Sequence, residues 1–259
     1  MLGVLPFVLL LATYLFGSAV RLHANPDDKL LPALTTIGES VRAYAIEEDR
    51  RTGEVLLWRD TRASLQRLGL ALVVSASLGL ALGIAIGVIP YVRGLLAPFV
   101  TAVSMIPPLA LLPILFITLG LEELSKITLI VIGVAPVIVR DLSLRAQELP
   151  AEQIIKAQTL GASSWQLILR VVLPQLGPRL IDALRLTLGS AWLFLIAAEA
   201  IASTEGLGYR IFLVRRYLAM DVILPYVFWI TLLAFLMDLL LRALRRRAFP
   251  WAETRPEGV

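Results

Sequence analysis

The sequence predicts an all-α membrane protein with six transmembrane helices. Its 259 residues are 58% hydrophobic and 17% charged, whereas a soluble domain usually carries about 25% charged residues. Six apolar segments account for the difference, and each is close to the roughly 20 residues that a helix needs to cross a bilayer. Helices are the predicted spans because backbone groups in lipid must be paired within the segment, and because the alternation typical of barrel strands is absent.

The first apolar segment, Leu2 to Val20, is predicted to be a transmembrane anchor helix (residues 1–20). A signal peptide is the alternative, but no Lys or Arg precedes the segment, and it exceeds the usual length of the apolar region in such peptides. Residues 21–62 contain seven basic and eight acidic side chains and are predicted to form a periplasmic or interfacial segment. Apolar residues at helical spacing after Pro32 indicate an amphipathic helix on the membrane surface.

The remaining spans belong to a core at residues 63–245, which is followed by a tail at 246–259. In the second span, Gly79, Gly83 and Gly87 recur every four residues, a spacing that lets another helix approach closely. Prolines are expected to interrupt two of the later spans. The spans are expected at 65–89, 95–119, 127–139 (extending to 144), 178–201 and 222–241, with a turn at 90–94 and with breaks at Pro107-Pro108, Pro113 and Pro136.

The basic residues that flank the spans predict the orientation of the chain. An arginine cluster follows the last span, and further basic residues lie in the loops after the second and fourth spans, all on one side if six spans alternate. By the positive-inside rule, both termini and the polar loop at 140–177 are cytoplasmic. The net charge of +4 is thus assigned to topology rather than to nucleic-acid binding. The residues used are Arg93, Arg140, Arg145, Lys156, Arg170, Arg242, Arg245, Arg246 and Arg247; Arg210, Arg215 and Arg216 fall on the other side, in a mixed segment at 202–222 predicted to be re-entrant or interfacial.

The loop at 140–177 is predicted to contain two short helices set at an angle. The first is expected at 151–159, with acidic residues near its start that suit the positive end of the helix dipole. It ends where Gly161 allows the chain to turn with φ > 0. Either Ser163 or Ser164 can cap the second helix by accepting a backbone hydrogen bond.

The second helix of the loop is predicted to present an apolar face outside the membrane. It is expected to end at Leu173-Pro174, because proline disfavours the helical conformation of the residue before it. An exposed apolar face on a cytoplasmic loop predicts a protein partner with a complementary groove. The residues of this face are Trp165, Ile168, Leu169 and Val172.

This loop resembles the EAA loop of the permease subunits of binding-protein-dependent ABC importers. That loop has the form Glu-Ala-Ala, three residues, Gly, and then a hydrophobic helix ending near Leu-Pro. Of the Glu-Ala-Ala triplet only Ala157 is present, and Glu152, one turn earlier, is the acidic residue that can take its place. The patterns Ala-Trp-Leu, Ala-Ala-Glu and Gly-Leu-Gly-Tyr within 191–209 look like the nitrate, sulfonate, taurine and bicarbonate branch of these permeases. The resemblance covers roughly residues 30–245, and its matching loop positions are Gly161, Ala162, Ser163, Leu173 and Pro174.

The resemblance implies a type I ABC importer permease fold with a cytoplasmic coupling helix, in a bacterial inner membrane. It implies two cytoplasmic ATPase subunits, a second permease copy, most simply as a homodimer, and a periplasmic solute-binding protein. No cofactor is implied. The chain lacks the Walker A pattern of an ATPase, so the hydrolysis of ATP is assigned to a separate polypeptide. The residues implied to couple to the ATPase are Glu152, Ala157, Gly161, Ala162, Ser163, Trp165, Leu173 and Pro174.

The solute and its path are less readable from the sequence. The branch implies nitrate, a sulfonate, taurine or bicarbonate, while the stretches at 25–32 and 213–217 look more weakly like permeases associated with urea or guanidine utilisation. Ionisable and polar residues inside spans are candidates for a translocation path. The candidates are Ser104, Met105, Arg185 and Glu199.

Other function classes find little support in the sequence. A stand-alone secondary transporter or a membrane scaffold protein is the alternative, but no convincing internal repeat appears and neither explains the loop. No catalytic group or metal site is predicted, because the chain has no cysteine and its single histidine, His23, is expected in a loop. An enzyme is therefore not indicated.

Overall fold

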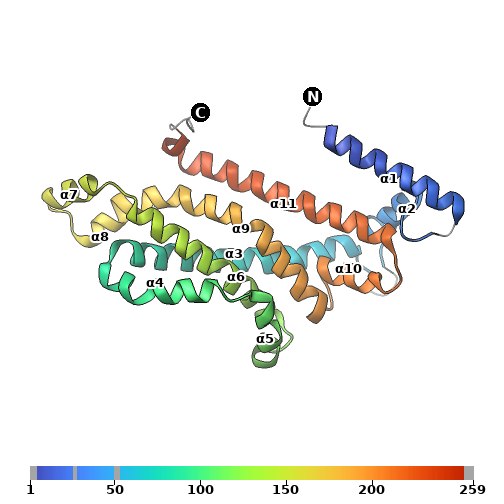
Figure 1. Cartoon of the computed structure of the whole chain (residues 1–259), viewed down its shortest axis with the longest axis horizontal. Coiled ribbons are helices and arrows are strands. Elements are labelled where there is room, and N and C mark those ends of the chain that lie inside the picture. The colour runs from blue at the N-terminus through green and yellow to red at the C-terminus, as the bar shows by residue number, and fades with distance from the viewer. Residues whose placement is uncertain (1–4, 26–27, 50–52, 254–259) are drawn as a thin grey trace. The chain divides into compact units, whose positions relative to one another are not determined.

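Helices account for all regular secondary structure in the computed structural model, which describes residues 5–25, 28–49 and 53–253 (Figure 1). Among these residues, five helices are long and apolar enough to cross a membrane, and a bent pair makes a sixth span if it is counted as one. The predicted all-α membrane class is confirmed, with five to six spans. They are α1 (Leu5–Ala24), α3 (Leu56–Val88), α6 (Glu123–Gln147), α8 with α9 (Ser164–Leu167 and Leu173–Ala202), α11 (Met220–Ala248) and the pair α4 (Pro90–Ser104) and α5 (Leu112–Leu119).

The chain divides into two compact units. The first consists of Met1–Ser64 and Glu199–Leu232, and the second consists of Leu65–Ala198 and Leu233–Val259. The long helices α3, α9 and α11 contribute residues to both. The loop between α6 and α9 belongs wholly to the second unit, so its geometry can be described within that unit.

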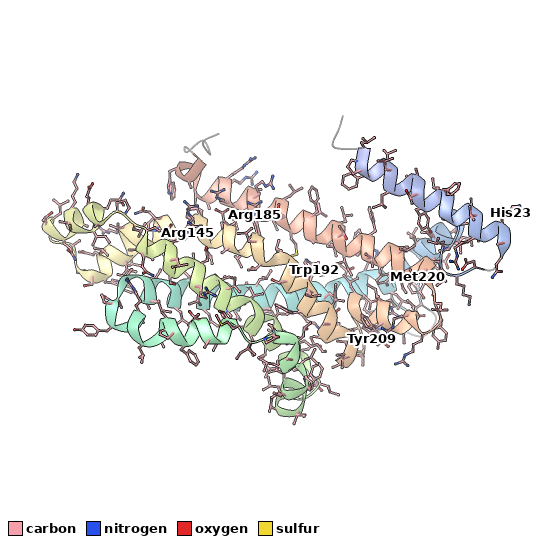
Figure 2. All side chains as sticks on the ribbon, in the orientation of Figure 1. His23, Arg145, Arg185, Trp192, Tyr209 and Met220 are labelled. Atoms are coloured by element: carbon pink, nitrogen blue, oxygen red, sulfur yellow. The ribbon has the colours of Figure 1, made fainter. Side chains whose placement is uncertain are left out.

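The first unit contains α1, α2 (Leu34–Ala45) and α10 (Leu207–Arg215), together with parts of α3, α9 and α11. The amphipathic helix expected after Pro32 is present as α2, and a further short helix, α10, lies within the mixed segment. In α1, the hydroxyl of Tyr14 donates to the carbonyl of Pro32 at 2.7 Å, which fixes α1 to the start of α2. His23 lies in the last turn of α1 rather than in a loop (Figure 2).

The third span is bent at the predicted proline pair. The helices on either side of Met105–Pro107 form an angle of 84°, and a short 3-10 turn (Pro108–Leu111) leads into α5. Pro113 does not break the chain again, contrary to expectation, because it lies in the first turn of α5. A backbone N–H in that turn would have no partner within the helix, so proline is tolerated there.

Two other proline predictions are wrong. Pro90 does not form a turn with the residues after it but is the first residue of α4, so that Ile89 alone separates α4 from α3. Pro136 does not end the fourth span, because α6 continues through it to Gln147. Before Pro136, Gly133 of α6 packs against Phe194 of α9. After it, Ile138 and Ala146 pack against glycines of α3. This packing on both sides of Pro136 holds the helix together across the missing hydrogen bond.

The glycines of α3 allow α6 to approach closely, as predicted. A methyl group built on Gly79 would lie 2.4 Å from a side-chain carbon of Ile138, and one on Gly87 would lie 2.3 Å from Cβ of Ala146. Both distances are far below van der Waals contact, so these positions need a residue without Cβ. The neighbour of Gly87 is itself a Cβ atom, which can move only with its backbone.

Gly87→Ala is therefore expected to destabilise the permease by about 2 kcal/mol, because overpacking forces backbone shifts of α3 or α6. Gly69→Ala on the same helix is the matched control, since a methyl group there meets nothing within 4 Å. Thermal unfolding in detergent, followed by size-exclusion chromatography, measures the difference. A melting temperature for Gly87→Ala equal to that of Gly69→Ala would contradict the close α3–α6 packing.

Candidate functional site

The first helix of the loop, α7 (Ala151–Thr159), ends in a Schellman motif. The N–H of Ala162 donates to the carbonyl of Ala157 at 3.0 Å, and the N–H of Gly161 donates to the carbonyl of Gln158 at 2.9 Å. Gly161 has φ = +81°, the left-handed conformation that this motif requires. Three residues of the predicted coupling pattern, Ala157, Gly161 and Ala162, are thus the positions that form this helix end.

The second helix of the loop begins with a capping box at Ser163. The hydroxyl of Ser163 accepts from the N–H of Gln166 at 3.3 Å, and the side-chain oxygen of Gln166 accepts from the N–H of Ser163 at 2.9 Å. The prediction of Ser163 or Ser164 as the cap is resolved in favour of Ser163. Because α7 ends and α8 begins with adjacent capping motifs, the angle between them is fixed by local hydrogen bonds.

Four apolar side chains of this loop are exposed. Leu160, at the tip, is 80% exposed and Trp165 is 66% exposed. Ile155 and Leu169 are the other two exposed apolar side chains. The predicted stripe is only partly correct, because Val172 is fully buried and Ile168 is half-buried. We call the exposed set the coupling surface; it consists of Ile155, Leu160, Trp165 and Leu169.

The predicted helix end at Leu173-Pro174 is wrong. Residues Ile168–Val172 form a π-helical turn, and the helix continues through Leu173 (φ −58°, ψ −45°) into α9. A π-helical turn changes the backbone hydrogen-bond spacing just before Pro174, which has no N–H to donate. Helix α8, the π-turn and α9 therefore form one continuous segment from Ser164 to Ala202.

A glutamine pair braces the loop against this segment. The side-chain amide of Gln175 in α9 donates to the side-chain oxygen of Gln153 in α7 and to the carbonyl of Val171, both at 2.9 Å. The sequence pattern did not indicate this pair, because its members lie on different helices. The remaining predicted coupling residue, Glu152, is exposed in the first turn of α7. In the described part of the chain, Glu152 forms no ion pair.

Glu199 is fully buried in the first unit and binds the N-terminus of α10. Its carboxylate accepts from the hydroxyl of Ser64 at 2.8 and 2.9 Å and from the N–H of Gly208 at 2.9 Å. The hydroxyl of Ser64 in turn accepts from the N–H of Leu207 at 2.9 Å. The first N–H groups of a helix have no partner within it, and here residues of α3 and α9 supply the acceptors. The predicted role of Glu199 in the path stays a prediction.

A second buried carboxylate completes this polar cluster. Asp60 in α3 accepts from the N–H of Gly206 at 3.0 Å, from Nε of Arg210 at 2.8 Å and from the hydroxyl of Tyr226 at 3.2 Å. Burial by itself lowers the pKa of Arg210, but the hydrogen bond and the negative charge of Asp60, with smaller contributions from Tyr226 and Tyr44, together outweigh burial and raise it. The ion pair with Asp60 neutralises Arg210, one of the arginines that fall on the non-cytoplasmic side of the predicted topology. Arg210 therefore has little influence on the orientation of the chain.

Arg185, a predicted path residue, lies in an ion-pair network between α9 and α11. Its guanidinium contacts Asp238 at 2.6 Å and points toward α11 (Figure 2). Asp238 also contacts Arg242 at 3.1 Å, and Asp182 contacts Arg245 at 3.4 Å. These contacts join α9 to the part of α11 in which the arginine cluster begins.

Ser104 and Met105, the other predicted path residues, lie at the bend of the third span. Ser104 is the last residue of α4, and its hydroxyl donates to the carbonyl of Thr101 at 2.8 Å. The same hydroxyl accepts from Nη1 of Arg140 in α6 at 3.1 Å. Met105 is exposed at the bend. Among the described residues, no group of His, Asp and Glu could hold a metal ion.

Comparison with known proteins gives consistent matches to this chain. A family model described as "Binding-protein-dependent transport system inner membrane component" matches residues 77–250. The taurine transport system permease protein TauC of Escherichia coli (strain K12) is 42% identical over 199 residues, which cover 76% of this chain and 72% of TauC.

Two further relatives are more distant. The putative aliphatic sulfonates transport permease protein SsuC of Bacillus subtilis (strain 168) is 30% identical, over 75% of this chain and 71% of SsuC. The nitrate import permease protein NrtB of Leptolyngbya laminosa is 28% identical, over 77% of this chain and 71% of NrtB.

A solved structure shares the fold. A chain of the MetNI methionine ABC transporter, in an inward-facing conformation, matches with a TM-score of 0.59 and 21% identity, over 74% of this chain and 97% of that chain. The similarity at this level of identity concerns the arrangement of the helices alone.

Proposed function

This chain belongs to the family of binding-protein-dependent transport system inner membrane components, and we propose that it conducts small sulfonate- or nitrate-type solutes under the control of an ATPase bound to its coupling surface. The chain is the permease component of an ABC importer and is not itself the ATPase. It is a multi-pass inner-membrane protein with the predicted type I importer fold. The family assignment replaces the alternatives of a stand-alone secondary transporter and a membrane scaffold.

The observation that carries the proposal is the exposed coupling surface on a locally rigid loop. Its apolar side chains lie in α7, at the tip of the loop and in the first turns of the segment Ser164–Ala202, where exposure to water is unfavourable unless a protein covers them. The Schellman motif, the capping box and the Gln153–Gln175 pair hold α7 and α8 in one arrangement. A surface that is held rigid can transmit the closure of an ATPase to the spans, whereas a flexible loop would absorb it.

The orientation and assembly follow from the same proposal. The loop carries Arg145, Lys156 and Arg170, and an arginine cluster follows α11, so these segments and both termini are placed in the cytoplasm. Each of two ATPase subunits receives one coupling surface from a permease dimer, most simply a homodimer. A periplasmic binding protein delivers the solute from the other side.

The solute class rests on the relatives. The proteins named for taurine, aliphatic sulfonate and nitrate transport all align with about three-quarters of this chain. These solutes share a compact group of negatively charged oxygens, so we assign the permease to solutes that carry such a group.

Purification of this chain from detergent-solubilised membranes tests the proposal. We expect an ATPase to co-purify at one copy per permease, and the reconstituted complex to take up taurine or an alkanesulfonate only with ATP and a binding protein. Uptake of guanidinium serves as the cation control and is expected to be absent. A chain that purifies without an ATPase would contradict the coupling assignment.

Gly161→Val is expected to reduce transport strongly, and Gly161→Asn only mildly. A methyl group at Gly161 meets nothing within 4 Å, so the effect arises from its positive φ alone. Asn tolerates the left-handed region, whereas a β-branched residue does not. The uptake of solute by reconstituted complexes, at equal amounts of folded permease, measures the two effects. Equal uptake by both variants would show that the Schellman turn does not position the coupling surface.

A further inference from the structure

Arg140 lies in a span of the second unit but, unlike two other arginines in spans of that unit, it is not paired with an acidic residue. Arg67 contacts Glu123 at 2.9 Å, and Arg185 contacts Asp238 at 2.6 Å. Over the described residues, Arg140 forms no ion pair, and its one hydrogen bond is the donation to the hydroxyl of Ser104 at 3.1 Å. The neighbouring acid, Asp141, lies 3.7 Å from Arg145 instead. An unpaired cation in a membrane helix is costly and usually marks a functional position.

The side chain of Arg140 extends toward the bend of the third span, where it meets Ser104. The contact between Gly87 and Ala146 places the start of α4 beside the end of α6. From a rise of 1.5 Å per residue, Arg140 lies about 10 Å from that end and Ser104 about 21 Å from it. An arginine that faced lipid would extend toward the nearer water, yet this guanidinium reaches the deeper residue at the bend of the third span.

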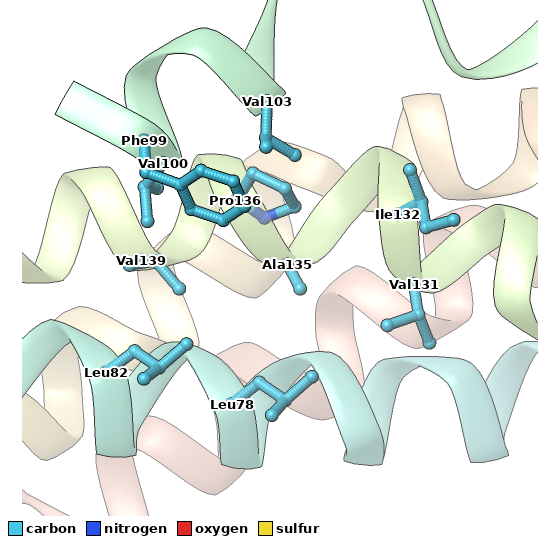
Figure 3. Close-up of a pocket in the computed structure, with 10 residues that line it drawn as sticks. All are labelled: Leu78, Leu82, Phe99, Val100, Val103, Val131, Ile132, Ala135, Pro136 and Val139. Carbon is cyan, nitrogen blue, oxygen red and sulfur yellow. The ribbon is translucent and has the colours of Figure 1, made fainter. Parts of the chain in front are cut away.

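An apolar cavity adjoins this contact. It has a volume of about 220 Å³ and is lined by α3, α4 and α6 without any polar surface (Figure 3). A volume of about 150 Å³ is enough for benzene, so this open pocket has room for a short aliphatic chain. Val103 and Val139 of the lining directly precede Ser104 and Arg140 in the chain, so the same segments of α4 and α6 form the cavity and the Arg140–Ser104 contact. The lining residues used here are Leu78, Leu82, Phe99, Val103, Pro136 and Val139.

We propose that Arg140 is the solute-binding residue of the permease for alkanesulfonates and related anions. The guanidinium binds the sulfonate oxygens with two parallel hydrogen bonds, a geometry that arginine favours for such groups. Ser104 is the positioning residue that holds the guanidinium at the bend, and the apolar cavity takes the aliphatic chain. The inference rests on the proposed function and assigns it a site within this chain.

The test measures the binding of methanesulfonate and butanesulfonate to the whole transporter in nanodiscs of neutral lipid, without the binding protein. We expect Arg140→Gln to weaken the binding of both anions at least tenfold, and Arg140→Lys to weaken it less. Arg42→Gln, which removes an exposed arginine of α2, is the charge-matched control and is expected to bind like the wild type. The ATPase activity of Arg42→Gln without solute is expected to equal that of the wild type.

A second measurement separates the cavity from the charge. Each methylene that enters an apolar cavity is expected to tighten binding about fourfold, so the wild type should prefer butanesulfonate to methanesulfonate. Val103→Trp fills the cavity and is expected to remove this preference while methanesulfonate still binds. If that variant does not fold, the preference of the wild type alone tests the role of the cavity, and its absence counts against it.

The outcomes distinguish this inference from the function on which it rests. If the wild type transports sulfonates and Arg140→Gln binds them equally well, the assignment of Arg140 is overturned and the function stands. If the wild-type complex neither binds nor transports any sulfonate or nitrate, the proposed solute class itself fails. If discs with anionic lipid abolish the Arg140-dependent binding of butanesulfonate, the site belongs to lipid headgroups, and the solute assignment is overturned.

Discussion

Trp165→Ala is expected to abolish ATP-driven transport while leaving the permease folded. The side chain is 66% exposed, so its removal costs the isolated chain little packing. In a complex, a tryptophan at the centre of an interface typically contributes 2 kcal/mol or more, which corresponds to an ATPase that binds at least about 30-fold more weakly. Transport by reconstituted complexes, ATPase recovery on co-purification and the melting temperature of the permease together measure the effect.

Tyr91→Ala is the matched control for this variant. Tyr91 is 91% exposed at the start of α4, in the same unit, and its loss removes an exposed aromatic side chain that does not belong to the coupling surface. It is expected to keep both transport and ATPase recovery. The coupling role of the surface would be refuted by a Trp165→Ala complex that retains its ATPase and transports at the wild-type rate.

Gly206→Ala is expected to destabilise the first unit by about 3 kcal/mol or more. Gly206 has φ = +127° and ψ = 160°, a region that only glycine occupies without strain. An added methyl group would also lie 2.6 Å from the carboxylate of Glu199, which is buried and held by Ser64 and Gly208. The carboxylate cannot move aside without losing these hydrogen bonds. Thermal unfolding in detergent measures the loss.

Gly53→Ala separates backbone strain from the carboxylate clash. Gly53 has φ = +67° in the same unit, but a methyl group there meets nothing within 4 Å. It is expected to lower stability by about 1 kcal/mol, from the left-handed conformation alone. If Gly206→Ala cost no more than Gly53→Ala, the polar cluster around Glu199 would be looser than its distances indicate.

The features that could be predicted from the sequence depend on interactions between residues close in the chain. The apolar runs predicted the spans because the length of a membrane helix is set by the bilayer. The turn at Gly161 and the cap at Ser163 were also predictable, since both motifs form their hydrogen bonds within five residues. The glycines of α3 were read correctly because small residues at this spacing act through one helix face.

The proline predictions failed because a single residue does not decide whether a helix continues. Pro136 and Pro174 each remove one hydrogen bond, and tertiary packing or a π-helical turn can compensate for it. Pro107-Pro108 removes two in succession, and there the helix does bend. Among prolines inside a helical segment, the number of consecutive lost bonds thus separates the bend at Pro107-Pro108 from the continuous helices at Pro136 and Pro174. Pro90 and Pro113 lie in the first turn of a helix, where no bond is lost.

The polar contacts could not be predicted, because their partners are far apart in the sequence. Asp60 meets Arg210, and Ser64 meets Glu199, across 150 and 135 residues. Arg140 was interpreted only as a marker of orientation, since its contact with Ser104 spans 36 residues. A spacing of four between Asp60 and Ser64, which places both on one face of α3, was the one available signal.

The π-helical turn at Ile168–Val172 sets the direction in which the loop points around the axis of α9. Each residue of an α-helix advances the chain by about 100° around the axis, and a π-turn accommodates one residue more than an α-turn does. A chain shorter by one residue in this turn could keep every capping motif of α7 and α8. Its Trp165 would nevertheless face a direction rotated by about 100°. The number of residues in this turn therefore fixes the rotation of the loop about the helix axis. The length of the segment, as much as its side chains, decides which direction the coupling surface faces.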